Sequence, residues 1–163
     1  MKTIYLAGGC FWGTQKFFDQ FDGVEKTEVG YANGKTPAPT YEEVKKGSGH
    51  AETVKISYNE AVIPTRRLLE YYFMVIDPTS INRQGEDEGV QYRTGIYYDD
   101  PSLLPDALAV CAEVSDRIGR PLAVEVAPLD GFFPAEEYHQ KYLEKNPAGY
   151  CHIPRGMMEL GRR

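Results

Sequence analysis

The stretch Thr3-Ile4-Tyr5-Leu6-Ala7-Gly8-Gly9-Cys10-Phe11-Trp12-Gly13 shows how the fold begins and contains a candidate nucleophile, Cys10. Its apolar residues 3–7 predict a strand, and the two glycines predict a tight turn. Apolar residues then continue at helical spacing at Phe17, Phe18 and Phe21, so we expect a helix with Cys10 in its first turn. Unpaired N–H groups and the positive helix end there favour the thiolate, which is the nucleophilic form.

Two other interpretations of this stretch are open. Free cysteine is among the most buried residue types, so an inert core cysteine is the common case. A glycine-rich turn supports a reactive role for Cys10, because glycine is needed where the backbone approaches a ligand. The same turn resembles a phosphate loop only weakly, since no Gly-Lys-Ser/Thr follows it.

Length and charge restrict the class of protein. A chain of 163 residues with a net charge of −6 predicts one domain, residues 1–163, with a full hydrophobic core. The acidic balance argues against nucleic acid or an anionic membrane as partner. No signal peptide and no apolar stretch of membrane-spanning length are seen, so we expect a soluble, cytoplasmic protein.

Strand and helix patterns alternate along the chain without a regular βαβ rhythm. Several strands are apolar on one side only, which predicts an α+β fold with two layers, its sheet covered mainly on one face. We expect a long polar loop at residues 77–91 and an irregular tail from about residue 146. The predicted strands are residues 3–7, 25–32, 54–58, 94–98 and 122–126, and the predicted helices are residues 10–23, 41–46, 64–75, 104–118 and 135–145.

The three cysteines predict different roles. Cys111 falls on the helical stripe Leu104, Leu108, Cys111, Ser115 and Ile118, which favours a structural place in the core. Cys151 follows a Pro-Ala-Gly breaker near the C-terminus, where a thiol can reach a sulfenic acid formed elsewhere and close a disulfide. An incidental exposed thiol is the alternative. The spacing fits neither a disulfide framework nor a metal site.

Polar residues near apolar ones suggest the partners of the nucleophile. Glu52 follows a glycine loop at the start of a strand, and a carboxylic acid in an apolar pocket stays protonated and can donate. A solvated glutamate is the alternative. Tyr41 and Tyr92 border loops and have hydroxyl groups suited to an oxygen ligand, although twelve tyrosines are present. We expect His50 and His139 to be structural.

These motifs together resemble the peptide methionine sulfoxide reductase A family. The run of residues 8–13 is similar to its GCFWG signature, and residues 49–52 are similar to its GHAE motif. Residues 77–79, 82–85 and 91–93 resemble its central loop, while residues 135–143 and 146–151 resemble its C-terminal region. The resemblance runs in order from Ile4 to about Ile153.

The resemblance implies a two-layer α/β sandwich with a mixed central sheet that reduces the S-epimer of methionine sulfoxide, free or in proteins. It implies that no metal or cofactor is needed, that thioredoxin or dithiothreitol is the reductant, and that the protein repairs oxidised proteins. We expect a monomer. The implied residues are the nucleophile Cys10, the acid Glu52, the resolving Cys151, the oxygen-binding Tyr41 and Tyr92, the supporting Asp87, and the methyl-holding Phe11 and Trp12.

Three positions depart from the family pattern. Ile76 stands where His is common, and Glu88 and Val90 replace the usual Val and Thr around Gly89. Ile76 is expected to change packing. Glu88 adds negative charge, which by like-charge repulsion is expected to raise the pKa of Glu52 or Cys10.

Two other functions use the same cysteines. A thiol peroxidase also needs a reactive and a resolving cysteine, but it would need neither Trp12 nor Glu52 and would consume hydrogen peroxide rapidly. A redox-sensing or peptide-binding module would use Cys10 and Cys151 only as a switch. Steady turnover of a sulfoxide with excess dithiothreitol excludes the switch.

Overall fold

The computed structural model describes residues 1–162 and is built on a six-stranded sheet in the order β7-β6-β1-β3-β2-β8. Neighbouring strands are antiparallel except β6 and β7, which are parallel, so the sheet is mixed. The elements are β1 (Lys2–Ala7), α1 (Phe11–Asp19), β2 (Val24–Ala32), α2 (Tyr41–Lys45), β3 (Ala51–Tyr58), α3 (Thr65–Met74), β4 (Arg83–Gln84), β5 (Asp87–Glu88), η1 (Val90–Tyr92), β6 (Gly95–Tyr98), η2 (Pro101–Leu103), α4 (Leu104–Ile118), β7 (Glu125–Pro128), β8 (Phe132–Pro134), η3 (Glu137–His139), α5 (Tyr142–Lys145) and η4 (Arg155–Arg162).

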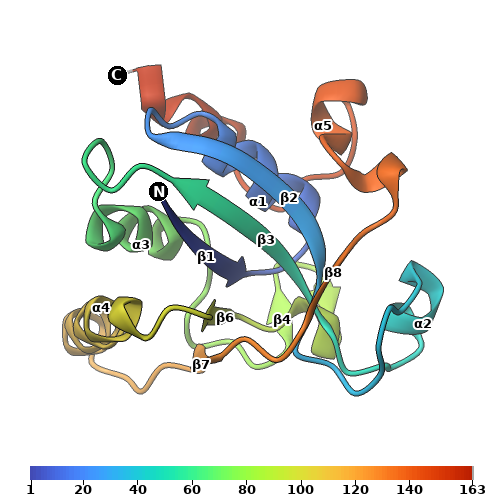
Figure 1. Cartoon of the computed structure of the whole chain (residues 1–163), viewed down its shortest axis with the longest axis horizontal. Coiled ribbons are helices and arrows are strands. Elements are labelled where there is room, and N and C mark those ends of the chain that lie inside the picture. Colours follow the sequence, from blue (N-terminus) through green and yellow to red (C-terminus); the bar gives the residue numbers. More distant parts are fainter. Residues whose placement is uncertain (163) are drawn as a thin grey trace.

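The helices α1, α3 and α4 cover one face of the sheet. Each contributes side chains to the cluster that also contains Ile4, Val54 and Ile56, which point from the strands to that face. Figure 1 shows β1, β3 and β2 side by side, with α1 against β2 and with α3 beside α4. The opposite face has only a small cluster around Tyr5 and Tyr97. The predicted α+β two-layer sandwich with a mixed central sheet is confirmed.

The register of the central strands determines where the candidate site lies. Ala7, at the end of β1, pairs with Thr53, and Tyr31 of β2 pairs with Glu52. The chain leaves β1 through Gly8 and Gly9, the latter at φ +81°, and enters α1 at once. The start of α1 and the start of β3 therefore lie at the same end of the sheet.

The predicted core stripe of α4 is wrong by one residue. Ala107, Val110 and Val114 are its buried residues, whereas Leu108 is 52% exposed and Ile118 is 38% exposed. Both stripes have helical spacing, and the contact with α3 selects the one that includes Val110. Cys111 is half-buried against the core cluster at its edge, and burial raises the pKa of its thiol.

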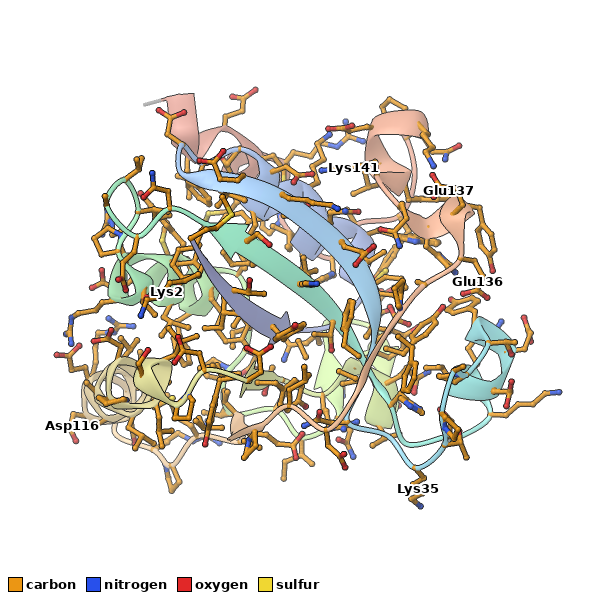
Figure 2. The ribbon with its side chains drawn as sticks, viewed as in Figure 1. Lys2, Lys35, Asp116, Glu136, Glu137 and Lys141 are labelled. Carbon is orange, nitrogen blue, oxygen red and sulfur yellow. The ribbon has the colours of Figure 1, made fainter. Side chains whose placement is uncertain are left out.

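The predicted helix over residues 135–145 is also wrong. The segment forms the short 3₁₀ turn η3 and the single-turn helix α5, which Lys141 separates with a left-handed φ of +53°. Figure 2 shows Lys141 at the start of α5, and its Nζ lies 2.6 Å from Oδ2 of Asp19 and 3.0 Å from Oγ1 of Thr27. These tertiary contacts stabilise a conformation that costs about 1 kcal/mol locally.

Smaller differences concern the loops and the tail. The strand predicted over residues 122–126 is β7 (Glu125–Pro128), β8 was not predicted, and the 77–91 loop contains the β4–β5 hairpin and η1. The tail from about residue 146 is not wholly irregular, because η4 forms within it. No helix in residues 1–162 combines the length and apolarity needed to cross a bilayer.

Candidate active site

Cys10 lies at the N-cap of α1, one residue before the position that the sequence predicts. Its φ and ψ of −61° and 125° are extended, and its side chain is only 8% exposed. Burial and the nearby Glu52 raise the pKa of the thiol well above its ordinary value, and the backbone N–H of Trp12 opposes them. The expected preference for thiolate is therefore wrong for the protein at rest, because desolvation outweighs the helix end.

Glu52 points from β3 to the start of α1. Its Oε1 accepts a hydrogen bond of 3.2 Å from the backbone N–H of Phe11, which is one of the unpaired donors of the first helical turn. The residue is 1% exposed, and within residues 1–162 its Oε2 is buried without a hydrogen-bond partner. Burial raises its pKa to about 8, against the Phe11 hydrogen bond and with help from the charge of Asp87. Glu52 is thus a protonated acid at neutral pH, and the solvated alternative is excluded.

Tyr41 and Tyr92 lie near Glu52 on separate elements. Tyr41 is the first residue of α2, and Thr40 caps the N-terminus of this helix. The backbone N–H of Tyr41 donates a hydrogen bond of 3.0 Å to Oε2 of Glu136. Tyr92 ends η1, after the positive-φ Gly89. Burial raises the pKa of both phenols, and the charge of Glu52 adds to it. Both hydroxyl groups therefore stay protonated and can donate.

Aromatic rings surround the start of α1. Phe11 is 1% exposed and half-buried Trp12 stacks on Tyr142, with 3.8 Å between ring centroids and 13° between planes. The indole N–H of Trp12 donates a hydrogen bond of 2.9 Å to Nδ1 of His139, and the centroids of the His139 and Phe11 rings lie 5.2 Å apart. Since an indole can only donate, Nδ1 of His139 has no proton. Burial lowers the pKa of His139, which fits the neutral ring.

His139 is the residue that the sequence interpretation missed. The sequence predicts that it packs locally on a helix, whereas its ring accepts a hydrogen bond from Trp12, 127 positions earlier in the chain. The one available signal was its place in residues 135–143, which resemble the C-terminal motif of the family. Glu136 beside it connects two more elements: Oε1 accepts from Tyr31, and Oε2 accepts from Tyr41, next to α2 (Figure 2). His50 hydrogen-bonds Ser48 over 2.8 Å and is buried, as a structural role requires.

Asp87 is an acidic residue whose charge influences Cys10 and Glu52. It lies on β5, accepts 3.1 Å from the hydroxyl of Tyr150, and its charge raises the pKa of both Glu52 and Cys10. Glu88 is exposed, pairs with Arg83 at 3.3 Å, and is not among the charges that raise either pKa. The expectation for Glu88 is thus wrong, because β alternation turns neighbouring residues to opposite sides.

The departure at Ile76 has a packing reason. A Cβ on Gly8 would lie 2.6 Å from Cγ2 of Ile76, so the isoleucine fits against bare backbone at the turn before Cys10. The structure gives no specific explanation for Val90, which starts η1.

Cys151 lies against α1, one turn after Cys10. A Cβ on Gly13 would lie 2.8 Å from Sγ of Cys151, so the thiol uses the space that the glycine leaves. Residues i and i+3 of a helix lie on the same side, about 5–6 Å apart, which brings Cys151 near Cys10. Its neighbour His152 packs over Gly9. Burial raises the pKa of Cys151, while the charges of Lys16 and Arg155 lower it.

No group of His, Cys, Asp and Glu suited to a metal ion occurs among the described residues. Cys10, Cys111 and Cys151 are all free thiols. The site therefore combines a buried thiol, a protonated carboxylic acid, two phenols, an aromatic wall and a second thiol.

Comparison with known proteins identifies the family. The model of peptide methionine sulfoxide reductase matches residues 2–160. The chain belongs to this family. It is 56% identical over 153 residues to the peptide methionine sulfoxide reductase MsrA of Lachnoclostridium phytofermentans, which covers 93% of this chain and 92% of that protein. Members of the family are oxidoreductases, and so is this enzyme.

Solved structures of the family have the same fold. The reduced form of Mxr1 from Saccharomyces cerevisiae has a TM-score of 0.88 and 38% identity, over 94% of this chain and 91% of that one. A structure of Mxr1 in complex with Trx2 has a TM-score of 0.62 and 26% identity, over 86% and 84% of the two chains. The lower score belongs to the chain with a bound partner.

Proposed function

We propose that the enzyme reduces the S-epimer of methionine sulfoxide, free and in proteins, and that thioredoxin regenerates it. The observation that carries this proposal is Glu52, which is 1% exposed next to the Cys10 thiol and whose pKa burial raises to about 8. A sulfoxide oxygen is a poor leaving group, so a thiol can attack the sulfur only if an acid protonates the oxygen. In this reading, residues 1–163 are one catalytic domain, and the tail from about residue 146 carries the resolving cysteine.

The substrate methyl group would lie against Phe11 and Trp12, with the oxygen towards Glu52, Tyr41 and Tyr92. Only one sulfoxide epimer can place its methyl group and its oxygen in these two positions while the rest of the methionine side chain points to solvent. His139 keeps the Trp12 ring in place through its hydrogen bond. The selectivity for one epimer therefore follows from shape.

In the first half-reaction, the Cys10 sulfur attacks the sulfoxide sulfur while Glu52 gives its proton to the oxygen. A bond forms between the two sulfurs, and the protonated oxygen then passes to the Cys10 sulfur as the S–O bond of the substrate and the new S–S bond break. Cys10 is left as a sulfenic acid, methionine leaves with the electron pair, and the Glu52 carboxylate takes up the proton of the thiol. Cys10 is oxidised by two electrons and the sulfoxide is reduced by two. Asp87 helps to keep Glu52 protonated beforehand.

In the second half-reaction, the Cys151 thiol attacks the sulfenic sulfur, water leaves, and a Cys10–Cys151 disulfide forms. Thioredoxin would then reduce this disulfide by thiol exchange, and dithiothreitol can replace it. The complex of a family relative with Trx2 supports thioredoxin as the reductant. A monomeric, cytoplasmic protein that repairs oxidised proteins without metal or cofactor remains our prediction.

The deciding experiment measures turnover of the separated S and R epimers of N-acetylmethionine sulfoxide with dithiothreitol. We expect activity on the S-epimer only, and none for Cys10→Ser at unchanged circular dichroism. Activity on neither epimer, with rapid consumption of hydrogen peroxide, would instead establish a thiol peroxidase.

A further inference from the structure

A cavity of about 300 Å³ opens beside Cys151, outside the substrate site. This volume is at the lower end of the range for small-molecule sites. Cys10 is not part of its wall, and none of the candidate substrate-binding residues is. The cavity is lined by Lys16, Leu143, Pro147, Gly149, Cys151, Ile153, Arg155, Met158 and Glu159.

The charges of this cavity are mostly positive, although the protein has a net charge of −6. Lys16 on α1 and Arg155 at the start of η4 both lower the pKa of Cys151, so both act on its sulfur. Neither cation forms an ion pair with any side chain from residue 1 to residue 160, the part of the chain whose side chains the structure describes. Glu159 is the one acidic residue in the wall.

We propose that this cavity binds a small, carboxylate-rich peptide thiol that reduces the enzyme disulfide at Cys151. The proposal rests on the function proposed above, since it assumes that the Cys10–Cys151 disulfide forms. Two cations match two carboxylates, and Glu159 matches an ammonium group. The apolar wall around Leu143 and Met158 accepts the remaining chain of the ligand. Cys151 is the accessible sulfur, because Cys10 is 8% exposed and lies outside the cavity.

The chemistry is ordinary thiol exchange. The ligand thiolate attacks Sγ of Cys151, the disulfide bond breaks, and its electron pair goes to Cys10, which then takes up a proton. A second ligand thiol attacks the ligand sulfur of the mixed disulfide and releases Cys151 as a thiol. Two ligand thiols become one disulfide, and the two cysteines return to the reduced state.

The experiment compares glutathione with glutathione monoethyl ester, which has the same thiol but lacks the glycine carboxylate. The enzyme is first oxidised by one addition of the sulfoxide without reductant, and methionine and disulfide are measured. Reduction of the disulfide by each thiol is then followed by rapid quenching. We expect glutathione to react with saturation and about three- to tenfold faster than the ester.

The double variant Lys16→Gln/Arg155→Gln should remove this difference and leave the first methionine equivalent unchanged. The matched control Lys26→Gln/Lys55→Gln removes the same charge from the open face of the sheet, where both lysines line a separate hollow, and should behave as wild type. Turnover with thioredoxin should fall less in the first variant than turnover with glutathione.

Failure of the two proposals is distinguishable. Without methionine or disulfide in the first stage, the proposed function itself fails. A normal disulfide that glutathione and its ester reduce at equal rates overturns the present inference. So does a variant that loses thioredoxin turnover while it treats the two small thiols as wild type does, because the basic residues would then serve the protein reductant.

Discussion

The two proposed redox cysteines are held in opposite ways. Cys10 is 8% exposed between β1 and α1, and neighbouring residues in sequence form both elements. Cys151 is half-buried in an irregular segment and is held by contacts with residues more than 130 positions earlier, such as Gly13. The nucleophile is therefore fixed by local structure, and the second thiol by packing that a single side chain can disturb.

The two cysteines also differ in the charges that surround them. Burial raises the pKa of both thiols, but the helix N-terminus and an acid act on Cys10, while two cations act on Cys151. The first thiol is suited to exchange a proton with Glu52. The second is suited to attack, or to be attacked, next to solvent.

The largest expected effect is that of Glu52→Gln. The amide keeps an acceptor for the Phe11 N–H but has no acidic proton, so formation of the first methionine equivalent should slow by about 10²- to 10⁴-fold. Quenched-flow chromatography of methionine measures this rate. In the wild type the rate of methionine formation should fall as the pH rises above about 8, because Glu52 then loses the proton that it donates. An unchanged rate in the variant would exclude Glu52 as the acid.

Glu52 should also make the folded state less stable at high pH. The pKa of Glu52 is about 8 in the folded protein and 4.5 in the unfolded chain. Between pH 4.5 and pH 8 the folded state therefore keeps a proton that the unfolded state has lost. Stability therefore falls as pH rises from about 4.5 to 8, by roughly 3 to 5 kcal/mol. Glu52→Gln should remove this slope in urea unfolding, and the same slope in both proteins would contradict the raised pKa.

A smaller effect should distinguish the role of Cys10 from that of Cys151. A Cβ at Gly13 would lie 2.8 Å from Sγ of Cys151, so Gly13→Ala should displace that thiol while α1 itself gains helix propensity. We expect the first methionine equivalent at the normal rate, about tenfold slower thioredoxin turnover, and more dimedone-trapped sulfenic acid at Cys10.

Gly156→Ala is the matched control, because a Cβ there meets nothing within 4 Å. It should behave as wild type in all three measurements. If Gly13→Ala recycles as fast as Gly156→Ala, close contact between Cys151 and α1 is not needed for disulfide formation.

A third change tests the aromatic wall. His139→Phe keeps a ring but removes the acceptor of the Trp12 indole, which is worth about 1 kcal/mol. KM for the S-epimer should rise about three- to tenfold, with little change in kcat. The single tryptophan should change its fluorescence, whereas Tyr138→Phe next to it should leave both readouts alone. A lower kcat at unchanged KM would show that His139 does not position the substrate wall.

The smallest effect concerns the acidic hairpin. Glu88 pairs with Arg83 at the surface, so Glu88→Val should leave the rate–pH profile as it is. Asp87→Asn should shift the alkaline limb of that profile to lower pH, because Asp87 raises the pKa of Glu52. A shift in Glu88→Val equal to that in Asp87→Asn would mean that both charges reach the centre.

Local pattern was sufficient for much of this molecule. The strand, glycine turn and helix around Cys10, the capped start of α2 at Tyr41 and the strand that carries Glu52 all follow from residues within a few positions of one another. The motifs pointed to Cys10, Glu52, Tyr41 and Tyr92, which lie together in the structure. Pattern failed at Lys141, where long-range ion pairing favours a left-handed residue over a continuous helix.

The sequence by itself therefore determined the fold class and the order of the main elements as far as β7, because periodicity and turn chemistry act between near neighbours, and its motifs determined the family. Only the tertiary structure decided that burial raises the pKa of Cys10, that His139 binds Trp12, and that Cys151 lies against Gly13. The physical reason is that desolvation and packing depend on everything that surrounds a group, and most of these surroundings come from distant parts of the chain.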